Sequence, residues 1–90
     1  MEIEFDQDKR SATLRERGLD FSRAGEIFAG PVMTKQDTRF DYGESRFITL
    51  GLLATRLVVS VWTPRGNSCR IISMRYANER EKNKYTKFLG

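Results

Sequence analysis

The stretch from Arg56 to Arg75 reads RLVVSVWTPRGNSCRIISMR, and it decides the fold of this chain. Two runs rich in Val and Ile flank a short cluster, Thr63 to Asn67, that contains Pro, Gly and Asn. β-branched side chains fit a pleated sheet, Pro presets the φ angle, and Gly and Asn tolerate a positive φ. The stretch therefore predicts a long β-hairpin, with strands over residues 56–62 and 68–75.

The predicted hairpin is cationic. It contains no acidic residue and four arginines, namely Arg56, Arg65, Arg70 and Arg75. Strict alternation places Arg70 and Arg75 on opposite faces of the second strand, unless a β-bulge or the sheet edge intervenes. Ile71 and Ser73 then share the face of Arg75. A row of guanidinium groups on one side of a sheet indicates an anionic partner.

The length and composition fit one small domain over residues 1–90. The chain is 39% hydrophobic and 31% charged, as is typical of globular proteins. Its formal charge of +4 is unevenly distributed. Residues 1–45 hold seven Lys or Arg against ten Asp or Glu, whereas residues 46–90 hold nine against two. This asymmetry indicates a nucleic-acid-binding surface in the second half.

Several functional classes are excluded by residues that the sequence lacks. It has no histidine, which excludes Ser-His and Cys-His catalysis and the usual metal triads. Cys69 is the only cysteine, so it has no disulfide partner within the chain and no thiolate zinc cluster. Asp37 and Asp41 lack the spacing of a calcium loop. We therefore expect no metal and no cofactor.

The ends and apolar runs of the chain bear on location. No apolar run approaches the ~18 residues needed to span a bilayer, so we expect no membrane association. Met1 is followed directly by Glu-Ile-Glu-Phe-Asp, which is unlike a secretory signal. We therefore expect a cytoplasmic protein.

Outward from the hairpin, the N-terminal part predicts a strand and two helices. Residues 2–5 alternate polar and apolar, as a strand does. A helix should follow Asp6, its N-cap, and end at Gly18. Asp20 should cap a second helix over residues 21–28, which Gly30 and Pro31 terminate.

The rest of the chain predicts more strands and one more helix. We expect a short strand at residues 32–34, a polar loop at 35–45, a strand at 46–53 and a tight reversal at 54–55. Asn78 and Glu81 have capping-box spacing at the start of a helix over residues 79–89. The predicted fold is α+β, with two N-terminal helices and a C-terminal helix packed on a small, mostly antiparallel β-sheet.

Several stretches resemble one known family more closely than the pattern alone requires. The resemblance covers nearly the whole chain, and its most specific part is the Ile-Ser-x-Arg-x-Ala segment with the Arg-Glu and Tyr after it. In these stretches the chain is similar to the BrnT family of bacterial toxins from type II toxin–antitoxin systems. The matching stretches are Phe5-Asp6 with Lys9, Gly18–Phe21, Asp41–Ile48, Thr63–Gly66, Arg70–Arg75, Ala77, Arg80-Glu81 and Tyr85.

The resemblance implies a fold similar to that of RelE-type ribonucleases. It also implies a toxin that cleaves RNA, inhibits translation and growth, and is neutralised by a BrnA-type antitoxin that represses the shared operon. The two proteins would form a hetero-oligomer, for example of two toxins and two antitoxins. That complex would bind operator DNA through the antitoxin.

The resemblance also implies site residues. Lys9, Arg65, Arg70, Ser73 and Arg75 match positions that would form the RNA-facing site. Of these, we expect Lys9, Arg65 and Arg75 to be catalytic. Family members commonly have Lys-His-Gly where this chain has Glu16-Arg17-Gly18, so Glu16 is an alternative proton acceptor. For RNA binding we expect a second set, namely Arg70, Ser73, Tyr76 and Arg80.

The chemistry of these residues fits RNA cleavage without a metal. A guanidinium holds a phosphate bidentately and stabilises the added charge of a pentacoordinate transition state. The nucleophile is the 2′-OH, and its proton must pass to a base, for which Lys9, Glu16 and Tyr76 are candidates. The alternative is a non-catalytic RNA-binding or antitoxin-binding module. Trp62 is expected in the core or at the antitoxin interface.

Overall fold

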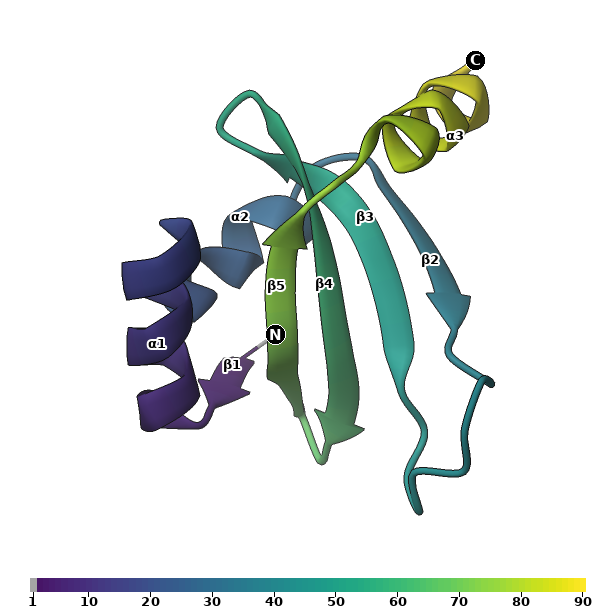
Figure 1. Ribbon diagram of the computed structural model, residues 1–90. Coiled ribbons are helices and arrows are strands. Elements are labelled where there is room, and N and C mark those ends of the chain that lie inside the picture. The colour runs from purple at the N-terminus through teal and green to yellow at the C-terminus, as the bar shows by residue number, and fades with distance from the viewer. Residues whose placement is uncertain (1) are drawn as a thin grey trace.

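A mixed β-sheet forms the centre of the computed structural model, which describes residues 2–90 (Figure 1). Across these residues the strands lie in the order β1-β5-β4-β3-β2. Neighbouring strands are antiparallel except for β1 and β5, which are parallel. The strands are β1 (Glu2–Phe5), β2 (Val32–Gln36), β3 (Phe47–Leu53), β4 (Arg56–Arg65) and β5 (Ser68–Tyr76).

The helices begin and end where their capping residues predict. The Asp6 side chain accepts hydrogen bonds at the start of α1 (Gln7–Arg17), and Gly18 ends that helix with φ +70°. Asn78 and Glu81 form the predicted capping box of α3 (Glu79–Leu89). The α+β class is confirmed. The predicted second helix is in fact a 3₁₀ turn, η1 (Phe21–Arg23), followed by the short helix α2 (Ala24–Phe28).

The central hairpin is confirmed, but its turn is shorter than predicted. β4 continues through Arg65, and only Gly66 and Asn67 connect it to β5. Gly66 has φ +56°, a conformation that glycine adopts without strain. Pro64 lies beyond Trp62, the last β4 residue that pairs with β3, so its missing N–H costs no bond to that strand.

A β-bulge in β5 corrects the strict alternation expected for this strand. Val61 pairs with Ser73 and Trp62 with Ile71, so Ile72 is an extra residue. Ile71 therefore points into the main core rather than sharing a face with Ser73. The bulge shifts the alternation of side chains by one residue. Arg70 and Arg75 therefore lie on the same face of the sheet, where strict alternation would have separated them.

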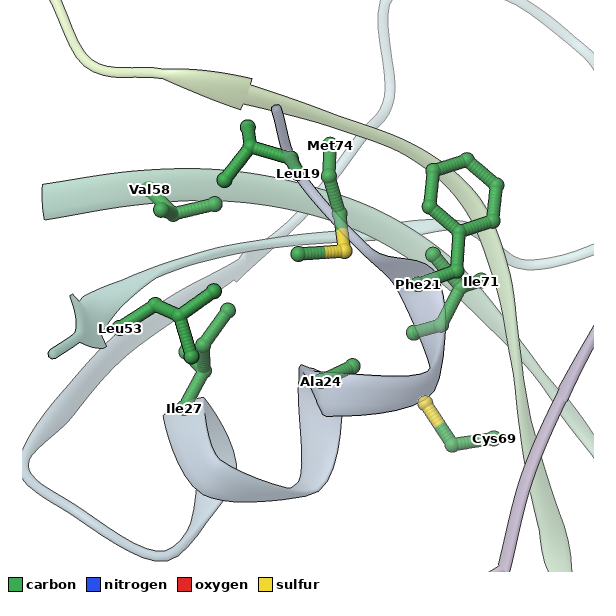
Figure 2. Close-up of a cluster of buried hydrophobic side chains, with 9 residues drawn as sticks. All are labelled: Leu19, Phe21, Ala24, Ile27, Leu53, Val58, Cys69, Ile71 and Met74. Carbon is green, nitrogen blue, oxygen red and sulfur yellow. The ribbon is translucent and has the colours of Figure 1, made fainter. Parts of the chain in front are cut away.

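The main core lies on one face of the sheet, between β3–β5 and the segment from Leu19 to Ile27. Figure 2 shows the side chains of this segment meeting those of the strands. Cys69 belongs to this core, and burial raises the pKa of its thiol to about 11. The buried members are Leu19, Phe21, Ala24, Ile27, Leu53, Val58, Cys69, Ile71 and Met74.

The opposite face of the sheet carries a smaller apolar cluster beneath α3. Its buried members are Leu50, Leu57, Val59, Ala77 and Tyr85. The Tyr85 hydroxyl donates a hydrogen bond of 2.7 Å to the Pro31 carbonyl and so fixes the helix over one end of the sheet. This smaller cluster leaves part of the second face uncovered.

Two glycine substitutions test the packing of the main core. A Cβ at Gly51 would lie 2.7 Å from Ile27 Cγ2 and 3.0 Å from Val32 Cγ1, and both atoms belong to stiff β-branched side chains. Gly51→Ala should therefore lower the free energy of unfolding by about 1–3 kcal/mol in urea denaturation. The matched control is Gly25→Ala in α2, where a Cβ meets nothing within 4 Å. It should leave stability unchanged or raise it by about 0.5–1 kcal/mol, and equal effects of the two substitutions would contradict the packing described.

Candidate functional site

A groove of about 510 Å³ lies between the uncovered part of the second sheet face and α3. We call it the sheet groove. Its floor is apolar and is formed by Met33, Ile48, Leu50, Val59 and Val61. Its polar lining consists of Lys35, Arg39, Ser73, Arg75, Glu81 and Lys84. Side chains of β2, β3, β4, β5, α3 and the loop after β2 thus meet in one place.

The sheet groove is strongly cationic. Lys35, Arg39, Arg75 and Lys84 each contribute a positive charge, against one carboxylate from Glu81. Like charges gathered in a concave surface with a low-dielectric floor create a positive potential that concentrates anions. An extended polyanion that presents several phosphates to several cations is the kind of ligand that this arrangement suits.

Arg75 is held at the groove by a bidentate ion pair. Both of its terminal nitrogens, Nη1 and Nη2, lie 2.8 Å from oxygens of Glu81. One of these oxygens also accepts the backbone N–H of Asn78 at 2.9 Å. The Arg75 side chain remains 47% exposed, so its guanidinium is oriented by Glu81 and still accessible to a ligand.

The same ion pair shifts the pKa of Glu81. The hydrogen bond from Arg75 lowers this pKa to about 2 against the opposing effect of burial, and the Asn78 N–H and the charge of Lys35 add to the lowering. Glu81 is therefore ionised at neutral pH.

Arg39 is held by a buried carboxylate at the other end of the groove. The Asp37 side chain is 1% exposed and accepts bonds of 2.8 and 2.9 Å from Arg39 Nε and Nη2. The Tyr42 hydroxyl donates to the same carboxylate at 3.0 Å. These bonds, those of Arg39 first, hold the pKa of Asp37 well below its usual range. The Arg39 guanidinium thus has a fixed direction, and the loop after β2 is braced at its start.

Two of the residues expected from the sequence lie in the sheet groove, and two others do not. Ser73 and Arg75 line it. Lys9 and Glu16 are exposed on α1, which contributes no side chain to the groove lining. That helix lies against β5 at the other side of the sheet, where Arg17 Nη1 donates to the Met74 carbonyl at 2.8 Å. The expected catalytic pairing of Arg75 with Lys9 or Glu16 is thus not assembled in this structure.

The remaining expected residues also lie outside the groove lining. Arg65, near the hairpin tip, lies 4.0 Å from Glu44. Arg70, two residues from the start of β5, pairs at 3.2 Å with Glu4 on β1. The other two are Tyr76, whose ring lies 3.6 Å below the Arg56 guanidinium, and Arg80, which is exposed in the first turn of α3.

Lys35, Arg39, Lys84 and Glu81 were not identified as site residues from the sequence. Alternation along β2 places Met33 and Lys35 on one face, and this pattern was available before the structure. The position of Arg39 depends on its bond to Asp37, and that of Lys84 on the direction in which α3 crosses the sheet. Glu81 was expected only as a capping residue, whereas it also binds Arg75.

Within residues 2–90, no three side chains of His, Cys, Asp or Glu lie close enough together to hold a metal ion. No helix in the described part of the chain has the length and apolar character needed to cross a bilayer.

The Arg75–Glu81 pair makes a testable contribution to stability. Because folding lowers the pKa of Glu81 from 4.5 to about 2, the pair stabilises the fold above pH 4.5 and loses its effect as the pH falls toward 2. Glu81→Gln should therefore be less stable than wild type near neutral pH, and the difference should vanish toward pH 2. Urea titrations across this pH range measure it.

The matched control for this experiment is Glu79→Gln. Glu79 lies in the same helical turn, but its side chain is 85% exposed and pairs with Lys82 at 3.3 Å. Its substitution should give a small difference with little pH dependence. A Glu81→Gln difference that stays constant from pH 7 to 2 would contradict the ion-pair account.

The comparisons with known proteins fit the geometry of the groove. Residues 5–81 match a family model described as the ribonuclease toxin, BrnT, of type II toxin–antitoxin systems. The match includes every groove residue except Lys84. A search of the curated proteins found no match. Because the family model covers well over half of the chain, the resemblance noted in the sequence is confirmed: this chain belongs to the BrnT family of ribonuclease toxins from type II toxin–antitoxin systems.

Proposed function

We propose that this chain is a metal-independent endoribonuclease whose active site is the sheet groove. The observation that carries the proposal is the guanidinium of Arg75, oriented by Glu81 and exposed in a cationic groove, in a member of a ribonuclease toxin family. We also propose that cleavage inhibits translation and growth. A likeness to the RelE-type ribonuclease fold belongs to the same proposal and is supported by the layered sheet and helices.

Phosphate binding is the first step of the proposed mechanism. Arg75 offers two parallel N–H donors to the scissile phosphate, while Lys35, Arg39 and Lys84 neutralise that phosphate and its neighbours. The charge that develops in the pentacoordinate transition state then lies opposite donors that are already in place. Ser73, also in the lining, orients the sugar or a phosphate oxygen through its hydroxyl.

We assign the two proton transfers to Glu81 and Lys84, which both line the groove. Glu81 takes the proton of the 2′-OH while the O2′–P bond forms. The P–O5′ bond then breaks, and Lys84 protonates the leaving 5′ oxygen. The products are a 2′,3′-cyclic phosphate and a 5′-hydroxyl. A phosphate bound to the remaining N–H groups of Arg75 shares the guanidinium charge with Glu81, which weakens the interaction that stabilises the Glu81 carboxylate. Its pKa then rises from about 2 toward the ordinary carboxyl value, which makes it a better base.

Replacing Arg75 tests the phosphate-binding role. Arg75→Ala should lower the rate of RNA cleavage in EDTA by about 10²–10³-fold, as expected for loss of a donor to a developing charge. Arg75→Lys should recover only part of the rate, since it keeps the charge but not the bidentate geometry.

The matched control for this experiment is Arg15→Ala, which removes an exposed arginine from α1. It should cleave within about twofold of wild type. Equal losses in the two variants would show that total charge, and not the groove, is responsible. Intact RNA at high wild-type concentration would overturn the proposal.

A second comparison locates the proton acceptor. Glu81→Gln should lower the cleavage rate by about 10²–10⁴-fold, the range for loss of a general base, when assayed at a pH where circular dichroism shows it folded. Lys9→Ala and Glu16→Gln, which alter the two acceptors implied by the family resemblance, should stay within about twofold of wild type because they lie outside the groove. The reverse result would place the base on α1.

RNA binding without cleavage is the second candidate function. It is favoured by the tight bonding of Glu81 to Arg75 and by the absence of histidine, since the chain then lacks a base poised near neutral pH. Under this function, RNA affinity falls steeply with rising salt and wild-type protein leaves RNA intact.

The proposed partners follow from the family. We propose that a BrnA-type antitoxin neutralises this toxin in the cytoplasm. The two proteins form a hetero-oligomer, such as two toxins with two antitoxins. In this proposal the complex binds operator DNA through the antitoxin. Membership of a toxin–antitoxin family supports the partnership. Co-expression with the neighbouring small gene, followed by co-purification and mass determination, measures the stoichiometry.

A further inference from the structure

Phe40 is conspicuous among the apolar side chains that the structure describes. It is 69% exposed, which exceeds the exposure of the other large apolar side chains on the surface of residues 2–90, such as Phe88 at 57%. An exposed ring contributes little to folding, because most of its surface stays in water in the native state. Packing within the domain therefore does not explain why this position carries an aromatic side chain.

The Phe40 ring is nevertheless held in place. Its edge meets the ring of Tyr42, with centroids 5.9 Å apart and an interplanar angle of 72°. Tyr42 is fixed in turn by its bond to the buried Asp37 carboxylate and by the Arg46 guanidinium, 4.1 Å from its ring centroid. The Phe40 ring is thus exposed to solvent and packs against Tyr42, whose own position is held by Asp37 and Arg46.

The ends of the loop that carries Phe40 are also tied to the sheet. The Asp37 N–H donates to the Arg46 carbonyl at 2.7 Å, and the Thr63 hydroxyl donates to the Ser45 carbonyl at 2.6 Å. These bonds join the loop to its own base and to β4. Phe40 therefore belongs to a loop whose two ends are held by hydrogen bonds.

The backbone of Phe40 adjoins the sheet groove. The residue before it, Arg39, lines the groove, and consecutive Cα atoms are about 3.8 Å apart. Arg39 pairs with Asp37 and Arg46 with Glu44, so two oriented guanidinium groups belong to the segment that carries Phe40. An exposed aromatic face beside cations matches the way single-stranded nucleic acids are bound, with bases stacked on rings and phosphates on arginines.

We propose that Phe40 is a specificity-determining residue that stacks on an unpaired nucleobase next to the phosphate held in the sheet groove. The substrate class is accordingly single-stranded RNA, since a base inside a duplex has no free face to offer. Arg39 binds the adjoining phosphate, so the ring and the guanidinium together fix the register of the strand along the groove. This inference rests on the proposed function and adds the strandedness and register of its substrate.

The test measures the affinity of single-stranded RNA oligonucleotides that carry 2′-fluoro groups, which remove the nucleophile and prevent cleavage. Phe40→Ala should bind about tenfold more weakly than wild type, as expected for loss of one stacked base, whereas Phe40→Trp should bind at least as tightly as wild type. The matched control is Phe88→Ala, which removes an exposed Phe from α3 outside the groove lining and should bind like wild type.

A scan of single abasic nucleotides along the oligonucleotide isolates the stacked base. At one position, loss of the base should weaken wild type about tenfold and leave Phe40→Ala unchanged, because the two changes remove the same contact. Equal abasic losses in both proteins at every position would overturn the proposal, as would wild-type affinity in Phe40→Ala.

Further outcomes separate this inference from the proposed function. If wild type cleaves RNA and Phe40→Ala binds and cleaves with unchanged preference, stacking is refuted while the ribonuclease function stands. If Phe40→Ala loses affinity for the co-purified protein partner and not for RNA, the ring belongs to a protein interface and the inference fails. If wild type neither binds nor cleaves RNA, both proposals fail together.

Discussion

The extra residue in β5 is the constraint on which the two faces of this sheet depend. The strand must bury Ile71 and Met74 in one core and also present Ser73 and Arg75 to the opposite side. Residues three apart cannot face the same way in a regular strand, because side chains alternate with a period of two. The bulge at Ile72 resolves this conflict. Without it, either Ile71 would leave the core, or Met74 would leave it and Arg75 would enter it.

A chain of this size covers the two faces of its sheet unequally. The segment from Leu19 to Ile27 seals one face, while α3 reaches only one end of the other and is held there by the bond between Tyr85 and Pro31. Small domains bury a smaller fraction of their surface than large ones, and here part of the unburied surface forms the sheet groove. The proposed chemistry thus occupies a region that the fold leaves open.

Features set by neighbours in sequence could be predicted, and those set by distant contacts could not. The hairpin strands, the stop at Gly18 and the capping box of Asn78 with Glu81 all depend on local chemistry, and each is confirmed. The bulge at Ile72 leaves no local signal, because its neighbours are all compatible with a regular strand. Because of this bulge, Arg70 and Arg75 share one face of the sheet, which strict alternation did not predict.

The candidate site shows the same division. Arg75 and Ser73 were expected from the sequence and lie in the groove, but the groove brings Arg75 together with Glu81 and Lys84 of α3 rather than with Lys9 and Glu16 of α1. The path of α3 across the sheet decides this, and it depends on tertiary packing under Tyr85. Helix position is a property of the whole core, which a pattern of spacings along one segment does not contain.

The burial of Cys69 has a practical consequence for studying this protein. Thiolates, not thiols, react with alkylating and oxidising reagents, and the Cys69 thiol is both sealed within the core and shifted to a pKa of about 11. A cysteine introduced on the surface is therefore chemically unique without any need to mutate the native one. A fluorophore or spin label on the loop after β2 would report on the groove from a single, known position.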